Sequence, residues 1–256
     1  MAHIIAISNH KGGCGKTTST INIGAALARM GQRTLLVDLD PQANLTISLG
    51  IDPAQQQHTT YTALSDSKGY LQPMPIAKGL DLVPSTADLV GVELELVNKA
   101  GREQVLAWKL AELLQHTQYK YILLDCPPSL GLLTLNAMTA ADVVYIPLQA
   151  QYLAMQGLAM LQQVIAQIGQ NLNKRLQIGG VFITQYDSRK ILHRNVKELA
   201  EQTLGAAVCK TAIRDNIALA EAPTAGQTIY QYAPKSNGAA DYMALAKEIH
   251  RRTTKK

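Results

Sequence analysis

Short apolar runs alternate along the chain with longer segments in which apolar residues recur at helical spacing. Several of the short runs are continuous rather than alternating, as in YILLD at 121–125 and VVYIPL at 143–148. Strands that are apolar at every position are typical of a parallel sheet covered on both faces. The predicted strands are His3–Ile7, Thr34–Asp38, Leu80–Pro84, Tyr121–Asp125, Val143–Pro147, Ile178–Thr184 and Ala207–Lys210.

Helix-length amphipathic segments separate these runs. In the last of them, Ala239–Arg252, helical spacing places Leu245 and Ile249 on one side. The alternation of strands and helices predicts an α/β fold with a doubly wound, mostly parallel sheet and helices on both faces. The segment Ile51–Gly79 contains several Pro and Gln residues and is expected to be an irregular excursion. The other predicted helices are Lys16–Met30, Ala87–Asn98, Arg102–Gln115, Leu132–Ala140, Leu153–Ile168 and Arg189–Leu204.

The composition is that of a globular protein with one sizeable core. The chain has 256 residues, 47% of them hydrophobic, so we expect a single domain over 1–256. No run approaches about 18 consecutive apolar residues, which argues against a membrane span, and the N-terminus does not resemble a signal peptide. The cysteines Cys14, Cys126 and Cys209 form no CxxC and predict neither a disulfide framework nor a cysteine metal site. A cytoplasmic protein is therefore expected.

The net charge of +5 is unevenly distributed. Residues 1–170 contain 10 Lys and Arg against 12 Asp and Glu, whereas residues 171–256 contain 14 against 7. Positive charge concentrated in the C-terminal third is typical of a surface that faces a polyanion. The alternative is a solvated basic face with a basic tail, which ends in Arg251, Arg252, Lys255 and Lys256.

The strongest local signal is HKGGCGKTT at 10–18, which follows a predicted strand and opens a predicted helix. Glycines let backbone N–H groups converge on phosphate oxygens, and a helix N-terminus adds the positive end of its dipole. In such a loop Lys16 reaches the β- and γ-phosphates and the Thr17 hydroxyl ligates Mg²⁺. A glycine-rich turn with incidental lysines is the alternative, since His10 stands where the usual pattern has its first glycine. The predicted nucleotide contacts are Lys11, Gly12, Gly13, Cys14, Gly15, Lys16, Thr17 and Thr18.

Aspartates end two further predicted strands. YILLDCPP places Asp125 at a strand end, as in a Walker B segment, and LLVDLDPQAN places Asp38 and Asp40 at another. Ligands of open α/β sheets bind at the carboxyl ends of the strands, so we expect these carboxylates near the phosphates. Alternation along the strand puts Asp38 and Asp40 on the same side. Each of these aspartates could instead cap the turn that follows it.

KGGxGKT, with its early lysine, resembles the deviant Walker A of the ParA/MinD/nitrogenase-iron-protein superfamily, and VDxDPQxN resembles its switch segment. Three later motifs resemble the ParA branch in both order and spacing: TxxDxR at 184–189, IRxNxxLxEAP at 213–223 and YxPxSxGA at 232–239. The resemblance runs the whole chain. It is that of a small, Soj-like ParA partition ATPase of the P-loop NTPase class, without an N-terminal helix-turn-helix extension.

This resemblance implies ATP and Mg²⁺ as cofactors and an ATP-dependent homodimer, in which the early lysine, Lys11, touches the nucleotide of the opposite subunit. It implies catalytic roles for Lys11, Lys16 and Asp40, with Asp40 orienting the water that attacks the γ-phosphate. The implied Mg²⁺ residues are Thr17, Asp38 and Asp125, and the residues implied beside the adenine are Gln185 and Pro234.

The implied function is that of a slow ATP hydrolase stimulated by a ParB-like or adaptor protein. Its ATP-bound dimer would bind double-stranded DNA on the nucleoid and segregate plasmid or chromosomal DNA, or position another cargo such as carboxysomes. Lys and Arg contacts to phosphate carry no base code, so such binding is non-specific and salt-sensitive. The candidate DNA contacts are Arg189, Lys190, Arg194, Lys210, Arg214 and Lys235, and each has the alternative role of a solvated charge or ion-pair partner.

Other functions share parts of these signals. A MinD-like ATPase that cycles on membranes needs an amphipathic C-terminal anchor, whereas this chain ends HRRTTKK. An iron–sulfur carrier needs cysteines that bridge subunits, and a ligase like dethiobiotin synthetase is not expected to carry the three later motifs. A nucleotide-gated scaffold with negligible hydrolysis is the non-enzymatic alternative. The sequence does not select a cargo.

Overall fold

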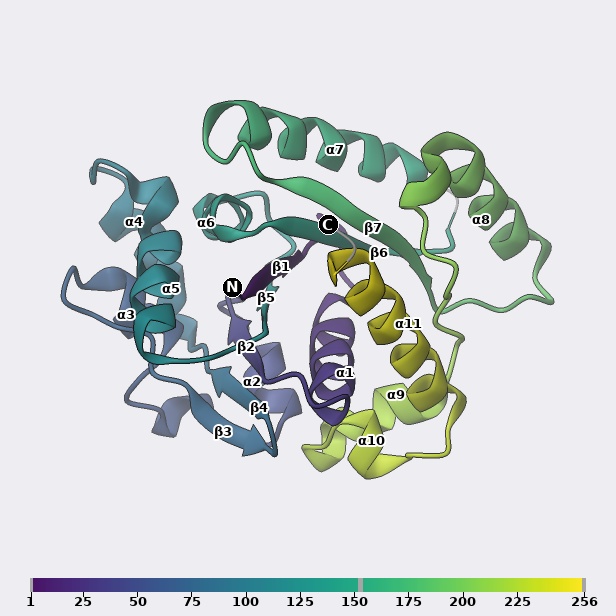
Figure 1. Ribbon diagram of the computed structural model, residues 1–256, viewed down its shortest axis with the longest axis horizontal. Helices are drawn as coiled ribbons and strands as arrows, with labels where there is room; N and C mark the ends of the chain where they lie inside the picture. The colour runs from purple at the N-terminus through teal and green to yellow at the C-terminus, as the bar shows by residue number, and fades with distance from the viewer. Residues whose placement is uncertain (1, 152–153, 255–256) are drawn as a thin grey trace.

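A seven-stranded sheet forms the centre of the computed structural model, which describes residues 2–151 and 154–254 (Figure 1). The strand order is β3-β4-β2-β5-β1-β6-β7. Neighbouring strands are parallel except at one edge, where β3 runs antiparallel to β4. The strands are β1 (His3–Ile7), β2 (Thr34–Asp38), β3 (Met74–Ala77), β4 (Leu80–Val83), β5 (Tyr121–Asp125), β6 (Val143–Gln149) and β7 (Gln177–Thr184).

Helices cover both faces of this sheet, and a separate hydrophobic cluster fills each interface. Every residue of β2 and β5 is buried. Leu35 and Ile122 point into one cluster, whereas their chain neighbours Leu36 and Leu123 point into the other. This arrangement explains why the central strands are apolar at every position. One face carries α1 (Lys16–Arg29) and α11 (Asn237–Thr254), and the other carries α4 (Val90–Leu96), α5 (Val105–His116), α6 (Leu132–Ala140) and α7 (Ala154–Asn171).

Further helices connect these elements. They are α2 (Asn44–Ser48), α3 (Thr60–Ser65), α8 (Ile191–Leu204), α9 (Ile217–Glu221) and α10 (Ile229–Tyr232). Single 3₁₀ turns occur at Pro53–Gln55, Ala87–Leu89, Arg102–Gln104, Gly205–Ala207 and Ala222–Ala225. The doubly wound, mostly parallel α/β architecture predicted from the sequence is confirmed. Leu153, the first residue of the predicted helix Leu153–Ile168, lies outside the described residues.

Two sequence-based predictions are wrong. The predicted strand Ala207–Lys210 is not a strand: the segment begins in a 3₁₀ turn, and a single bridge joins Val208 to Val181 of β7. Its apolar residues Val208 and Cys209 are buried, so the apolar run reflects packing rather than sheet pairing. The predicted irregular segment Ile51–Gly79 contains both α3 and β3. Proline has no backbone N–H to donate, so it is tolerated in an edge strand such as β3, which has a neighbouring strand on one side only. Pro75 therefore does not exclude a strand there.

Candidate functional site

The register of the sheet brings the ends of three central strands together. Asp125 of β5 pairs with Ile7 of β1 on one side and with Asp38 of β2 on the other. The loop over residues 8–15 leaves β1 at the same edge and leads directly into α1. The two strand-end aspartates therefore lie beside the predicted phosphate loop, as the sequence indicated.

The loop has the backbone geometry of an anion site. Gly13 and Gly15 adopt left-handed conformations, with φ of 72° and 86°, which a residue with a Cβ rarely does. Gly15 is the N-cap of α1, and no side chain caps the helix N–H groups. A Cβ built on Gly12 or Gly13 would meet no atom within 4 Å, so the space in front of the loop is open. This open helix N-terminus fits a phosphate group.

Lysine side chains lie on both sides of the loop. Lys16 is buried, and its Nζ donates a hydrogen bond of 3.1 Å to the main-chain oxygen of Lys11. The Nζ of Lys11 instead donates to the side chain of Gln151, outside the loop. Cys14 is buried against the loop, with its Sγ 3.2 Å from the main-chain oxygen of Lys11. Lys16 is thus folded over the loop, whereas Lys11 points away from it.

Asp125 is held by two hydroxyl groups of α1. Thr17 Oγ1 donates to one carboxylate oxygen at 2.7 Å, and Thr20 Oγ1 donates to the other at 3.1 Å. Burial raises the pKa of Asp125, and the negative charge of Asp38 raises this pKa further. Thr17 was expected near Asp125, because both were implied to bind the same Mg²⁺ ion. Thr20 was not predicted. Thr20 lies one helical turn after Lys16, and its helix position was the only available signal.

Asp38 is also fully buried and hydrogen-bonded. Its Oδ2 accepts bonds from the main-chain N–H of Thr46 at 3.0 Å and from Thr46 Oγ1 at 2.7 Å, and its Oδ1 accepts from the N–H of Asp40 at 3.1 Å. Thr46 Oγ1 also accepts from the N–H of Ser85, and Ser85 Oγ donates to the main-chain oxygen of Asp40 at 2.8 Å. Thr46 and Ser85, which sequence reasoning missed, thus fix both ends of the Asp38–Asp40 segment.

These groups fit a magnesium ion. The Thr17 hydroxyl and the carboxylates of Asp38 and Asp125 are hard oxygen donors, the type that Mg²⁺ prefers. Burial raises the pKa of both carboxyl groups, because charged oxygens lose their hydration there. The positive charge of Lys16 offsets only part of this effect at Asp125. A divalent cation beside the two carboxylates would stabilise their charged forms.

Asp40 lies on the path from β2 to α2. Its side chain is largely buried, and Oδ1 accepts a 2.9 Å hydrogen bond from the N–H of Gln42. The turn-capping role considered as the alternative for this residue therefore occurs in the structure. The second carboxylate oxygen accepts no hydrogen bond from any described residue, so it has capacity to bind a water molecule.

A small pocket of about 170 Å³ adjoins the loop on the β7 side. Gln185 Nε2 donates to the main-chain oxygen of Gly13 at 3.0 Å, and Thr184 Oγ1 donates to that of Cys14 at 2.9 Å. Gln185 lines the pocket, whereas Pro234, the other residue that the resemblance implies beside the adenine, does not. The opposite wall comes from the IRxNxxL segment, whose pocket role was not predicted. Its contributing residues include Asp215, Asn216 and Leu219.

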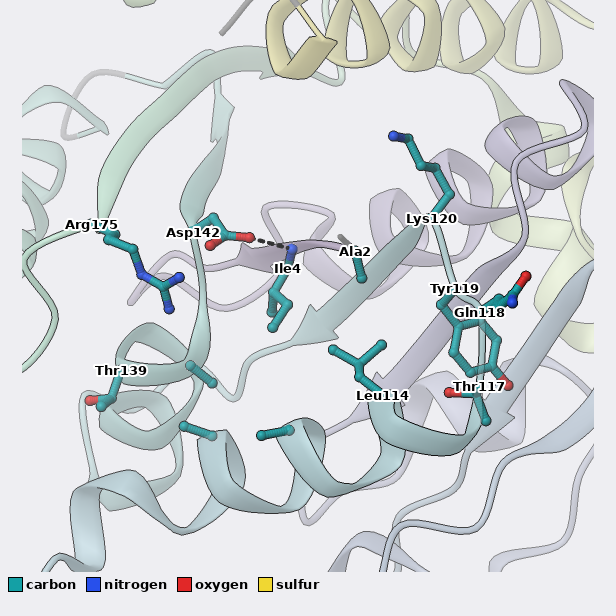
Figure 2. A pocket seen from close by; sticks show the side chains of 13 residues that line it. Ala2, Ile4, Leu114, Thr117, Gln118, Tyr119, Lys120, Thr139, Asp142 and Arg175 are labelled. Atoms are coloured by element: carbon teal, nitrogen blue, oxygen red, sulfur yellow. Dashed lines mark hydrogen bonds between the residues drawn. The ribbon is translucent and has the colours of Figure 1, made fainter.

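A larger cavity lies elsewhere. It has a volume of about 670 Å³ and is lined by Ile4, Lys120, Asp142 and Arg175, among other residues (Figure 2). Asp142 accepts a hydrogen bond from the N–H of Ile4 within this cavity. These residues lie at the amino ends of β1, β5, β6 and β7, opposite the phosphate loop. Cavity size therefore does not identify the predicted nucleotide site.

The predicted DNA contacts differ in how they are paired. Arg189 forms two hydrogen bonds to Asp187, at 3.0 and 2.9 Å, and Arg214 is similarly bonded to Asp241. Arg194 donates to main-chain oxygens, including that of Ser188. The other three candidates are exposed and form no ion pair with any described residue: Lys190, Lys210 and Lys235.

The chain is similar to known proteins over nearly its whole length. A family model described as an AAA domain matches residues 2–178. The sporulation initiation inhibitor protein Soj of Bacillus subtilis is 44% identical over 251 residues, which cover 97% of this chain and 98% of that protein. The chromosome partitioning protein ParA of Caulobacter vibrioides is 42% identical over 248 residues, covering 96% and 93% of the two chains. The chain belongs to the ParA family of P-loop ATPases.

A solved structure agrees with the fold of this ParA-family chain. Cobyrinic acid a,c-diamide synthase from Mycobacterium smegmatis, with bound ADP and magnesium, superposes with a TM-score of 0.85 at 36% identity. The match covers 99% of this chain and 96% of that one. In the part of the ParA-family chain that the structure describes, no helix is both long and apolar enough to cross a membrane.

Proposed function

We propose that this chain is an ATP-dependent partition or positioning ATPase, which binds DNA as an ATP-bound dimer and releases it after hydrolysis. The observation that carries the proposal is the hydrogen bond from Thr17 to Asp125, directly beside the open glycine loop. In a nucleotide-binding P-loop protein, this hydroxyl and this carboxylate share the magnesium ion of Mg-ATP. The identity with Soj over nearly the whole of both chains supports the partition role.

The residues at the loop divide the work of phosphoryl transfer. Lys16 leaves its bond to the Lys11 carbonyl and contacts the β- and γ-phosphates, while the loop N–H groups hold the phosphate oxygens. Thr17 and Asp125 would hold Mg²⁺, and Asp38 would support this set. Mg²⁺, when bound, neutralises charge that develops on the phosphates during transfer. Asp40 orients the attacking water through its carboxylate, while Ser85 holds the Asp40 main chain.

Lys11 provides the link between nucleotide and dimer. Its Nζ lies outward, bonded to Gln151, rather than over its own loop. A lysine in this position can exchange Gln151 for the phosphates of a facing subunit when two ATP-bound chains meet. Dimerisation would then depend on ATP, and hydrolysis would remove the group that the two lysines hold.

DNA binding is assigned to the basic C-terminal third. Lys190, Lys210 and Lys235 supply exposed positive charge, and Arg189, Arg194 and Arg214 add charge that is already bonded within the chain. Contacts of this type neutralise phosphates without reading bases. A ParB-like or adaptor protein is proposed to stimulate hydrolysis, and the DNA or other cargo bound to that partner is moved over the nucleoid.

The direct test measures phosphate release and DNA binding with the purified full chain. Hydrolysis should require Mg²⁺ and disappear with EDTA, and binding to duplexes of unrelated sequence should require ATP rather than ADP. Magnesium-independent DNA binding without any hydrolysis would contradict the proposal and favour a passive DNA-binding scaffold. ATP-dependent binding to anionic vesicles, with no binding to DNA, would favour membrane cycling instead.

A further inference from the structure

Helix α4 has two apolar faces. Val92 and Leu96 on its inward side, and Leu89 directly before the helix, are buried in the core cluster on that side of the sheet. Its outward side carries three further apolar residues, which we call the α4 ridge: Val90, Leu94 and Val97, exposed by 61%, 78% and 48%. Their spacing of four and then three positions places them in one row, because Val97 continues the helical dihedrals of α4. Burial in the monomer therefore explains only one of the two faces.

Carboxylates border the α4 ridge. Asp88 and Glu95 are exposed and Glu93 is partly exposed, and none of them forms an ion pair with a described residue. Glu95 accepts a hydrogen bond from the hydroxyl of Tyr61 at 3.1 Å. An apolar row with unpaired negative charge beside it is complementary to an amphipathic segment that carries Lys or Arg next to its apolar side. DNA does not fit such a surface, since its phosphates would face these carboxylates.

A second copy of this chain is also a poor occupant. If two α4 ridges met symmetrically about Leu94, the Glu93 and Glu95 carboxylates of one subunit would lie close to those of the other. Like charges placed across an interface oppose association. The charge of the surface thus selects a different protein with basic residues, rather than another subunit.

The α4 ridge is joined to the loop that follows Asp125. Glu93 Oε1 accepts a 3.4 Å hydrogen bond from the N–H of Leu133. The same carboxylate lies so close to Gly131 that a Cβ on this residue would clash with it. Gly131 precedes α6 and ends the segment that begins with Asp125. A ligand on α4 can therefore displace this segment through one side chain.

We propose that the α4 ridge is the docking site for an amphipathic helix of a partner protein, with an apolar row and Lys or Arg beside it. Docking shifts Glu93 and, through Gly131 and Leu133, the segment that carries Asp125. The expected consequence of docking, a change in ATP turnover, rests on the proposed function. The docking itself is independent of hydrolysis.

The test uses two synthetic peptides of about 18 residues, long enough to form a helix on binding. Both carry leucines at i, i+4 and i+7, with lysines beside the row in one peptide and glutamates in the other. Fluorescence anisotropy should show that the lysine peptide binds the wild-type chain and that salt weakens the binding. Affinity should fall about tenfold in Leu94→Ser and also fall in Glu95→Lys. Leu199→Ser is the matched control, because Leu199 is an exposed leucine of α8 that should not affect binding.

Three results would overturn the docking site: no binding of the lysine peptide, equal binding to wild type and Leu94→Ser, or preference for the glutamate peptide. Sedimentation without nucleotide tests whether a second copy of this chain occupies the α4 ridge. A wild-type dimer that Leu94→Ser converts to a monomer would assign the α4 ridge to a second copy and also overturn the proposal.

The coupling has its own measurement. Hydrogen exchange over residues 126–133 should change when the lysine peptide binds the wild-type chain, and unchanged exchange would disprove the link through Glu93. Turnover without peptide should be equal in wild type and Leu94→Ser. A wild-type chain that does not hydrolyse ATP would refute the proposed function and leave peptide binding intact. Normal ATP turnover, together with equal peptide affinity for wild type and Leu94→Ser, would refute the docking site alone.

Discussion

Lys16 and Lys11 lie five positions apart in one loop but make opposite contacts. Lys16 is folded over the loop, and Lys11 points outward to Gln151. We expect Lys16→Ala to lose ATP binding, because it removes the positive charge proposed to contact the β- and γ-phosphates. Lys11→Ala should keep much of the binding but lose ATP-driven dimerisation and hydrolysis. Equilibrium ATP binding and light scattering measure the two effects, and normal dimerisation of Lys11→Ala would show that its cross-subunit role is wrong.

The aspartates should separate metal binding from water orientation. Asp125→Ala removes the acceptor of the Thr17 and Thr20 hydroxyls and one of the carboxylates proposed to hold Mg²⁺, so hydrolysis should need a higher Mg²⁺ concentration. Asp40→Ala should still bind Mg-ATP but accumulate as a closed dimer with little turnover. A magnesium titration of phosphate release, combined with light scattering, distinguishes the two variants. Wild-type turnover by Asp40→Ala would transfer the water-orienting role to Asp38.

Much of this site was predictable from the sequence, because its main residues lie in short motifs at strand ends. Asp38 and Asp125 needed only the rule that parallel strands present their carboxyl ends at one edge. Thr46 and Ser85 were not predictable. Their hydrogen bonds join segments up to 45 positions apart, and no local pattern marks a threonine or serine as the partner of a distant carboxylate.

At the scale of elements, the buried strands were predicted well and the edge of the sheet was not. Central strands such as β5 are apolar throughout, and this pattern has few competing explanations. Strand β3 is short, half-exposed and contains Pro75, so its sequence resembles a loop. The false strand at Ala207–Lys210 shows the opposite error, because burial of Val208 and Cys209 without sheet pairing produces the same apolar pattern.

Helix α1 lies unusually close to β2 at Gly24. A Cβ built there would come within 2.5 Å of Leu36 Cδ2, in a fully buried part of the core. Gly24→Ala should therefore destabilise the protein by about 1–3 kcal/mol, despite the better helix propensity of alanine. Denaturant unfolding measures the change. In the matched control Gly169→Ala, the added Cβ in α7 makes only an ordinary contact, so stability should stay equal or rise by up to about 1 kcal/mol. Equal stabilisation by both variants would contradict the close packing of α1 on β2.

At the scale of the whole molecule, the fold joins two regions that the sequence separates. The phosphate loop and its carboxylates lie before residue 126, whereas most of the positive charge lies after residue 170. Hydrogen bonds from Thr184 and Gln185 to the loop connect them, since β7 ends beside Cys14 and Gly13. The Tyr186–Arg214 bridge extends this contact to the segment that carries Arg214. A nucleotide bound at the loop would therefore be adjacent to the start of the basic C-terminal third.

The basic surface should act as a switch only when two copies are joined. A monomer would present only one copy of this set of basic residues, and non-specific binding is weak when few phosphates are neutralised. Replacing Lys190, Lys210 and Lys235 together by alanine should leave ATP-driven dimerisation intact and weaken binding to duplexes of any sequence. Because each lost phosphate contact reduces the slope of log affinity against log salt by about 0.9, the salt dependence should become shallower. These lysines are the better choice, since Arg214→Ala would also remove the guanidinium that pairs with the largely buried Asp241 and leave it only the main-chain N–H of residue 214. Binding is measured over a salt series with ATP, with ADP and without nucleotide. Equal affinity in all three states would show that the basic surface is a passive charge and that dimerisation does not control it.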